Sequence, residues 1–147
     1  MSRAWPWAGC LVFLAGCLEH GDPYLAREDA TAPTVTATVP ASGAANFVRD
    51  AELEVTFSEF MDPLTLSPGI EISQGQERLV VAVTIPADSD NSGDYNPVES
   101  PYRVRLRPRD GALETGTSYV LVLRTLLTDT EGNPLAEEVR VPFTTGP

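Results

Sequence analysis

Residues 88–99 hold the most suggestive group of chemically active side chains in this 147-residue chain. The stretch reads DSDNSGDYNPVE, with oxygen-bearing side chains at its first, third, fifth, seventh, ninth and twelfth positions and a glycine at the sixth. Carboxylate and hydroxyl oxygens are ligands that Ca²⁺ prefers. The stretch is therefore a candidate calcium site, whose ligands would be Asp88, Asp90, Ser92, Asp94 and Glu99.

The spacing of these ligands resembles an EF-hand calcium loop, but the surroundings differ. An EF-hand loop joins two helices, whereas this segment lies between two predicted strands. Tyr95 stands where such loops usually carry an aliphatic residue, and Pro97 stiffens the exit. Two interpretations remain: a carboxylate-rich loop that chelates Ca²⁺ from the edge of a sheet, or a polar inter-strand loop whose composition reflects turn chemistry alone.

Groups that could perform catalysis are scarce. His20 is the only histidine, and Cys10 and Cys17 are the only cysteines. All three precede the predicted folded domain, which excludes His-based triads and His- or Cys-ligated metal sites within it. No glycine-rich phosphate loop opens a helix, and no carboxylate pair stands out for glycoside hydrolysis. We therefore predict no catalytic residues and a protein that is not an enzyme.

The first 17 residues have the composition of a secretory signal peptide. Arg3 precedes an apolar run at residues 4–16, which is shorter than the about 20 residues needed to span a bilayer. Residues 14–17 read LAGC and resemble a bacterial lipobox, which implies that Cys17 is lipidated and becomes the mature N-terminus. The alternative is an ordinary cysteine in a conventional signal peptide.

A lipidated Cys17 would place the protein in the cell envelope. Leu18 follows it where inner-membrane lipoproteins usually have Asp, so we expect a lipid-anchored protein of the outer membrane, exposed to the periplasm or the cell surface. Residues 18–32 are polar without an apolar period and are predicted to be a flexible tether. The mature chain could form no internal disulfide, so its domain must rely on its hydrophobic core.

The charge of the chain excludes one class of partner. The formal net charge is −11, and all ten basic residues are arginine. An acidic chain without a basic face does not hold nucleic-acid phosphates. The expected partners are the membrane, through the lipid, and an envelope protein or polysaccharide; the only cofactor under consideration is Ca²⁺.

Short runs with a period of two follow Pro33 and predict β-strands. Leu53, Val55 and Phe57, for example, alternate with polar residues, so that one face is apolar and the other wet. Pro, Gly, Asn and Asp separate the runs. The pattern predicts an all-β fold, a single Ig-like antiparallel β-sandwich over residues 33–145. Its about seven strands would lie at residues 34–39, 51–57, 69–73, 78–85, 102–107, 118–126 and 139–143.

Some details of the arrangement can also be predicted. The apolar run 118–126 would be a central strand, whereas Pro142 suits an edge strand. At most one helical turn is expected, at residues 60–66. Pairing of 51–57 with 102–107 would set Glu52 and Glu54 near Arg103 and Arg105. This row could be a docking stripe for an anionic glycan, but we favour a cross-strand charge ladder because opposite charges lie on the neighbouring strand.

Five short landmarks occur in order along the predicted domain: PASGA at 40–44, FSEFMD at 57–62, LETGTSY at 113–119, DTEGN at 129–133 and FTT at 143–145. Together they resemble the bacterial Ig-like domain of surface-layer proteins of the SbsA type. Phe60 departs from that pattern, which more often has proline there. The resemblance covers about residues 33–145 and implies an Ig-like sandwich with a structural signature. Its residues are Phe57, Met61, Gly116, Tyr119, Asp129, Gly132, Asn133 and Phe143.

Several of these residues have a physical role that can be stated without the resemblance. Phe57 and Met61 would close one end of the core. Tyr119 could bury its ring and direct its hydroxyl to the upstream backbone, as in the tyrosine corner of Ig-like sandwiches. Gly132 and Asn133 would supply positive φ for a turn.

The function expected from the sequence is that of a secreted, non-catalytic envelope lipoprotein. Its Ig-like module would act in structural support, adhesion or interaction with protein or polysaccharide. The alternative is a calcium-binding, calcium-stabilised surface module that uses residues 88–99. A fold resemblance does not by itself transfer a function.

Overall fold

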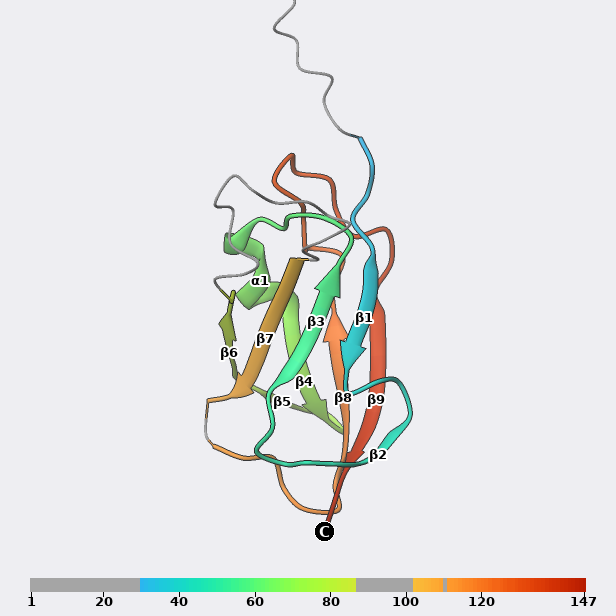
Figure 1. The fold of residues 1–147 in the computed structure, drawn as a ribbon, viewed down its shortest axis with the longest axis vertical. Helices are drawn as coiled ribbons and strands as arrows, with labels where there is room; N and C mark the ends of the chain where they lie inside the picture. The colour runs from blue at the N-terminus through green and yellow to red at the C-terminus, as the bar shows by residue number, and fades with distance from the viewer. Residues whose placement is uncertain (1–29, 87–101, 110) are drawn as a thin grey trace, which may run out of the picture.

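Two β-sheets pack face to face in the computed structural model, which describes residues 30–86, 102–109 and 111–147 (Figure 1). The four-stranded sheet has the order β1-β3-β7-β6, and the five-stranded sheet has the order β2-β9-β8-β4-β5. The strands of the first sheet are β1 (Val35–Val39), β3 (Leu53–Phe57), β6 (Val81–Thr84) and β7 (Tyr102–Pro108). Those of the second are β2 (Ala44–Phe47), β4 (Ile70–Gln74), β5 (Glu77–Leu79), β8 (Ser118–Leu123) and β9 (Val139–Thr145). The prediction of an all-β Ig-like sandwich is confirmed.

The core forms where the alternating residues of facing strands meet. Leu53 of β3 lies opposite Leu106 of β7, and both are 0% exposed. Tyr119 of β8, from the other sheet, is 1% exposed. Successive side chains of a strand point to opposite faces, so each strand that alternates apolar and polar residues gives one face to this core.

The described residues contain nine strands, so the prediction of about seven was too low. β2 lies between the predicted strands 34–39 and 51–57, where the sequence predicts no strand, and it pairs in parallel with β9. The predicted run 78–85 is two strands, β5 and β6, which belong to different sheets and meet at Val80. The chain passes from one sheet to the other between β1 and β2 and between β5 and β6. Hydrophobic periodicity predicts a strand, but it does not predict which sheet that strand joins.

The prediction that Pro142 marks an edge strand was wrong, because β9 lies between β2 and β8. The carbonyl of Pro142 accepts a hydrogen bond from the Gly43 N–H at 2.7 Å. Because the N and C=O of one strand residue point toward the same neighbour, the proline nitrogen also faces β2. The missing N–H therefore removes no hydrogen bond to β8. The run 118–126 was correctly expected at the centre, since β8 is the third of five strands.

The only helix among the described residues is α1 (Pro63–Gly69), which begins later than the turn predicted at 60–66. Asp62 caps it by accepting a hydrogen bond from the Leu64 N–H at 2.9 Å. Proline favours the first helical position because its missing N–H would be unpaired there in any case. No helix in the described ranges is long and apolar enough to cross a membrane.

The connections between the strands lie at the two ends of the sandwich (Figure 1). We call the end at which the described chain begins the N-terminal pole; it carries residues 58–62, α1 and the segment 124–138. The opposite end, where Pro147 lies, is the C-terminal pole; it carries residues 48–52 and the connection that follows β7.

Candidate functional site

Two groups of predicted site residues lie outside the described residues. They are the calcium candidates Asp88, Asp90, Ser92, Asp94 and Glu99, and the lipidation candidate Cys17. Both assignments stay predictions. The strands that flank the calcium segment are β6 and β7, which pair with each other in antiparallel register, with Thr84 opposite Arg105. The segment therefore joins two neighbouring strands, as the sequence indicated.

An acidic cluster at the N-terminal pole was not foreseen. Oxygens of Glu59, Asp129 and Glu131 all lie within 4.8 Å of one another. The cluster forms because the FSEFMD and DTEGN landmarks meet in space: Met61 and Asp129 form an antiparallel bridge, and the Asp62 N–H donates to the Thr128 carbonyl at 2.9 Å. No local pattern in the sequence reveals this approach, because the two landmarks are far apart along the chain.

Asp129 organises its own turn. It is 1% exposed, and its Oδ1 accepts hydrogen bonds from the backbone N–H groups of Glu131 at 2.9 Å and Asn133 at 2.7 Å. Its Oδ2 accepts from Asn133 Nδ2 at 2.7 Å. Gly132 has φ of 92°, whereas Asn133 does not have positive φ, so only the glycine fulfils that part of the prediction. The Asp129 carboxylate thus stabilises the turn and brings Glu131 toward Glu59.

Other signature residues hold the core and its ends together. The Tyr119 hydroxyl accepts a hydrogen bond from the Glu114 N–H at 2.9 Å, as expected for a tyrosine corner. Its ring stacks on Phe143 with centroids 5.7 Å apart. Phe57 and Met61 are each 1% exposed, and Gly116 has φ of 58° in the turn before β8. These contacts explain the landmarks by packing and turn geometry.

Tyr102 lies in the same packed region. It is 2% exposed, its ring meets Phe60 at a centroid distance of 5.4 Å, and its hydroxyl donates to the Met61 carbonyl at 3.5 Å. Burial, and secondarily the negative charge of Asp62, raises the pKa of Tyr102 to about 12. The phenol is therefore a neutral donor in the folded protein, and its environment opposes ionisation.

The outer face of the first sheet carries the charge ladder, displaced by one pair from the prediction. Glu54 lies opposite Arg105, with Oε2 3.5 Å from Arg105 Nε. Glu52 meets Arg107 at 2.9 Å, while Arg103 lies opposite Thr56. The acidic residues therefore pair with Arg105 and Arg107 rather than with Arg103 and Arg105. Since opposite charges face each other across the strands, the ladder explains this row without a ligand.

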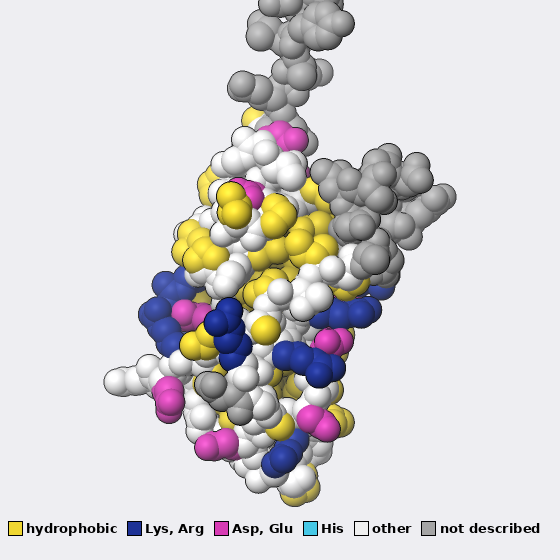
Figure 2. Space-filling view, turned by 90° about the vertical axis from the view of Figure 1, so that its left-hand side faces the viewer, with side chains coloured by type: hydrophobic (Ala, Val, Ile, Leu, Met, Phe, Trp, Pro, Cys, Tyr) yellow, Lys and Arg dark blue, Asp and Glu magenta, His cyan; other side chains and the backbone are white. Residues whose placement is uncertain are grey.

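An apolar area lies on the side of the molecule that carries α1 and β6. Figure 2 shows apolar side chains gathered on this side, with charged side chains on both flanks. Leu64 of α1 is 84% exposed, and Val80, just before β6, is 55% exposed. Exposed apolar side chains that are scattered singly are normal, so only a gathered apolar area is of interest.

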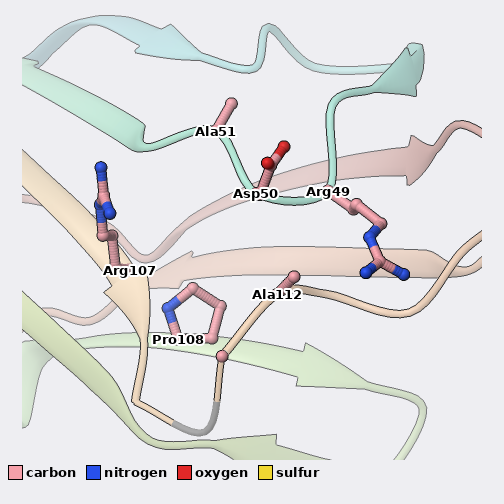
Figure 3. Close-up of a pocket in the computed structure, with 7 residues that line it drawn as sticks. Arg49, Asp50, Ala51, Arg107, Pro108 and Ala112 are labelled. Atoms are coloured by element: carbon pink, nitrogen blue, oxygen red, sulfur yellow. The ribbon is translucent and has the colours of Figure 1, made fainter.

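Two hollows adjoin at the C-terminal pole. The first has a volume of about 240 Å³ and is lined by Arg49, Asp50, Ala51, Arg107, Pro108, Gly111 and Ala112 (Figure 3). The second has a volume of about 490 Å³ and shares Arg49 with the first; its other lining residues are Asn46, Phe47, Val48, Gly146 and Pro147. Segments from separate connections build these hollows, so sequence spacing could not predict them.

Comparison with known proteins identifies a family for this chain and solved structures with a similar fold. A family model described as bacterial Ig-like domain matches residues 29–145. The N-terminal part of the bacterial S-layer protein SbsC has a similar structure, with 20% identity and a TM-score of 0.52 over 81% of this chain and 24% of that chain. A longer SbsC structure, residues 31–844, is matched over only 14% of its length, so the present chain spans a small part of such proteins.

Two smaller proteins have a similar fold over nearly their whole length. CopC from Methylosinus trichosporium OB3b is 17% identical with a TM-score of 0.54, over 78% of this chain and 94% of that one. PcoC, a copper resistance protein from Escherichia coli, is 16% identical with a TM-score of 0.52, over 76% and 98%. At these identities the likenesses establish the fold alone. No curated protein sequence gives a significant match.

Proposed function

The chain belongs to the bacterial Ig-like domain family, and from this premise we propose that it is a non-catalytic interaction module of the cell envelope, held there by a lipid on Cys17. The order of three segments along the sequence supports this proposal. A lipobox-like segment ends at Cys17, a polar stretch covers residues 18–32, and the family match accounts for nearly all that follows.

The similarity of the fold to an S-layer protein supports an envelope setting, as does the proposed signal peptide. A tether of residues 18–32 could reach about 50 Å when extended, at about 3.3–3.6 Å per residue. A β-sandwich on such a tether presents loops and sheet edges to partners while its core remains rigid. We place the protein in the outer membrane because Leu18, rather than Asp, follows the proposed anchor.

The anchor can be tested with two cysteine variants of the full chain. In cells fed a labelled fatty acid, wild-type protein should carry the label and fractionate with the outer membrane. Cys17→Ser should lose both properties, whereas Cys10→Ser, inside the same signal segment, should keep them. Label that persists in Cys17→Ser, or equal loss in both variants, would show that Cys17 is not the lipidated residue.

The interaction role needs a separate measurement. Purified full chain in neutral detergent should sediment with surface polysaccharide or with cell-wall material isolated from the source cells, and heat-unfolded protein should not. Cross-linking in intact cells extends the assay to protein partners. A folded chain that binds neither wall material nor polysaccharide, and forms no specific cross-link to an envelope protein, would overturn this role.

A second candidate function, calcium binding, is favoured by the position of the acidic cluster. Glu59, Asp129 and Glu131 supply oxygens within 4.8 Å of one another. Tyr102, the first described residue after segment 87–101, contacts Phe60 at the same pole. In the sequence, the proposed ligands Asp88, Asp90, Ser92, Asp94 and Glu99 shortly precede this tyrosine of the acidic pole. Such extracellular sites bind with Kd of about 10⁻⁴–10⁻³ M.

Thermal unfolding of the full chain in EDTA, in millimolar Ca²⁺ and in millimolar Mg²⁺ tests this candidate. A ligand that binds only the folded protein raises Tm, so we expect a rise with Ca²⁺ alone. Asp90→Ala should remove the rise. Glu77→Ala, which removes an acidic side chain from β5 in the five-stranded sheet, should retain it. Equal Tm values in EDTA and Ca²⁺ would leave residues 88–99 as a polar loop.

The likeness to PcoC does not lead us to propose a copper role. Copper is bound in proteins mainly by His, Cys and Met side chains. Residues 33–145 contain no His or Cys, and their only methionine, Met61, is 1% exposed in the core. The side chains that copper favours are thus not offered by the surface of this domain.

A further inference from the structure

Two arginines at the C-terminal pole differ from the others in having no side-chain partner among the residues that the structure describes. Of the eight arginines that the structure describes, Arg78, Arg105, Arg107, Arg124 and Arg140 form ion pairs. Arg103 takes part in a further interaction. Arg49 and Arg109, by contrast, have no side-chain hydrogen bond or ion pair with the described residues. Arg49 and Arg109 thus differ from the arginines that carboxylates neutralise within the described part of this acidic chain.

The first of the two hollows lies beside one of these cations. Figure 3 shows Arg49 on one side of Pro108 and Ala112, Arg107 on the other, and Asp50 on the loop that joins Arg49 to Ala51. Arg107 uses its Nε to bind Glu52 at 2.9 Å, which leaves the other donors of its guanidinium available. The hollow thus combines guanidinium donors with small apolar surfaces, while the Asp50 carboxylate points away from Pro108 and Ala112.

We infer that this hollow binds one uronic-acid unit of an acidic polysaccharide. Arg49 would pair with the sugar carboxylate, since a guanidinium matches the two oxygens of a carboxylate. Pro108 and Ala112, which lie between Arg49 and Arg107, would contact the apolar face of the ring. The inference deepens the proposed interaction role and rests on it, because it assigns that role to a particular surface and substrate class.

The size of the site favours a unit within a polymer. A volume of about 240 Å³ is below the about 300–1,000 Å³ of pockets that enclose a whole drug-sized ligand. The adjoining hollow shares Arg49 and offers Phe47 together with Val48, which is 62% exposed. A neighbouring sugar unit could therefore continue along the same pole with further apolar contact.

The position of the site lessens the repulsion that a net charge of −11 would exert on an anion. The acidic cluster of Glu59, Asp129 and Glu131 lies at the opposite pole. β7 alone, with 7 residues, separates the poles by about 23 Å at about 3.3 Å per residue. This distance exceeds the Debye length of about 8 Å at physiological ionic strength, so the far carboxylates are largely screened.

The test is a titration of the full chain, in neutral detergent, with polygalacturonate fragments of defined length. Fully methyl-esterified fragments of the same length serve as the uncharged ligand control. Arg49→Gln should weaken binding of the acidic fragments about 10-fold, which corresponds to about 1.4 kcal/mol. Arg140→Gln makes the same change of charge at an exposed arginine of β9 that is paired with Glu138, and it should leave binding unchanged.

Three outcomes would overturn the inference: no binding of the acidic fragments, equal binding of the methyl esters, or equal effects of Arg49→Gln and Arg140→Gln. Circular dichroism of both variants shows that each is folded. The sedimentation assay with wall material separates this inference from the proposed function. If wild type and Arg49→Gln sediment equally well, the interaction role stands and this hollow is not its site; if neither sediments nor cross-links, the role itself fails.

Discussion

Gly69, at the end of α1, lies against a part of the core that cannot easily move. A Cβ added there would lie 2.5 Å from both Cγ and Cδ2 of Leu127 and 3.3 Å from Cδ1 of Leu126. Leu127 is 0% exposed, and its backbone is fixed by hydrogen bonds to Arg124 at 3.0 Å and Leu135 at 2.8 Å. The Gly69 carbonyl is also held, since it accepts from the Arg124 N–H at 2.9 Å. Gly69→Ala therefore forces the core to rearrange.

Two effects of this substitution oppose each other. Overpacking a well-packed core costs about 1–3 kcal/mol. Replacing a helical glycine by alanine restores up to about 1 kcal/mol through helix propensity and reduced freedom of the unfolded chain. Since both contacted atoms of Leu127 are too close, we expect overpacking to dominate, with a net loss of about 1–2 kcal/mol. For a domain of this size the loss lowers Tm by about 4–8 °C, at about 4 °C per kcal/mol.

Urea and thermal unfolding followed by far-UV circular dichroism measure this loss, with Ser67→Ala as an exposed control in the same helix. The sharper test places Gly69→Ala in a Leu127→Ala background. Leu127→Ala alone should cost about 2–5 kcal/mol, but it removes the two atoms that the new Cβ would contact. Gly69→Ala should then be neutral or stabilising. An equal loss in both backgrounds would refute the clash and point to the helix itself.

The other predictions concern hydrogen bonds and one titrating group. Tyr119→Phe should lower stability by about 1 kcal/mol in urea unfolding, because the Glu114 N–H loses its acceptor but lies where water can replace it; no change would mean that the tyrosine corner contributes only packing. Asp129→Asn should cost about 1–3 kcal/mol, since its amide would face the Asn133 amide, and the swap Asp129→Asn with Asn133→Asp should recover much of the loss. Recovery no better than either single variant would contradict that pairing. Burial raises the pKa of Tyr102 to about 12. The stability linked to its neutral form is therefore fully present below about pH 10 and is lost as the pH rises to about 12. The expected loss is on the order of 2 kcal/mol. Tyr102→Phe should flatten this decline, and an unchanged pH profile would exclude Tyr102 as its origin.

Strand identity and one strand pairing could be predicted because they depend on local alternation. Leu53, Val55 and Phe57 alternate with polar residues, and the pairing of β3 with β7 followed from opposite charges on the two outer faces. The register error of one pair arose because charge complementarity is satisfied almost equally by Arg103 or Arg107 beside the glutamates. The hydrogen bonds of β3 and β7 fix the register, and no side-chain pattern encodes them uniquely.

The sheet changes at Pro40 and Val80 could not be predicted in the same way. A strand that leaves one sheet for another keeps β-like residues on both sides of the change, so its periodicity is interrupted for only a residue or two. β2 has the sequence AANF, which is poor in the β-branched residues that usually signal a strand. Its place beside β9 depends on partners distant in sequence, including the Gly43 to Pro142 hydrogen bond.

The same limit applies to sites. The sequence predicts a site at residues 88–99 because the candidate ligands are close together along the chain. In the structure, Glu59 lies near Asp129, and Arg49 lines the same hollow as Arg107, although these residues come from separate segments. Both groups follow from one property of a sandwich: its connections collect at two poles. The carboxylates of Glu59, Asp129 and Glu131 gather at the pole where the described chain begins. Arg49, which has no side-chain partner among the described residues, lies at the other pole. In the proposed role the tether enters at the acidic pole, so the arginine pole is the end directed away from the anchoring membrane. Arg49→Gln, which neutralises this charge, would then change what the protein binds at a distance from the membrane. Cys17→Ser would change where the protein is held. The two variants together therefore separate binding from anchoring within one chain.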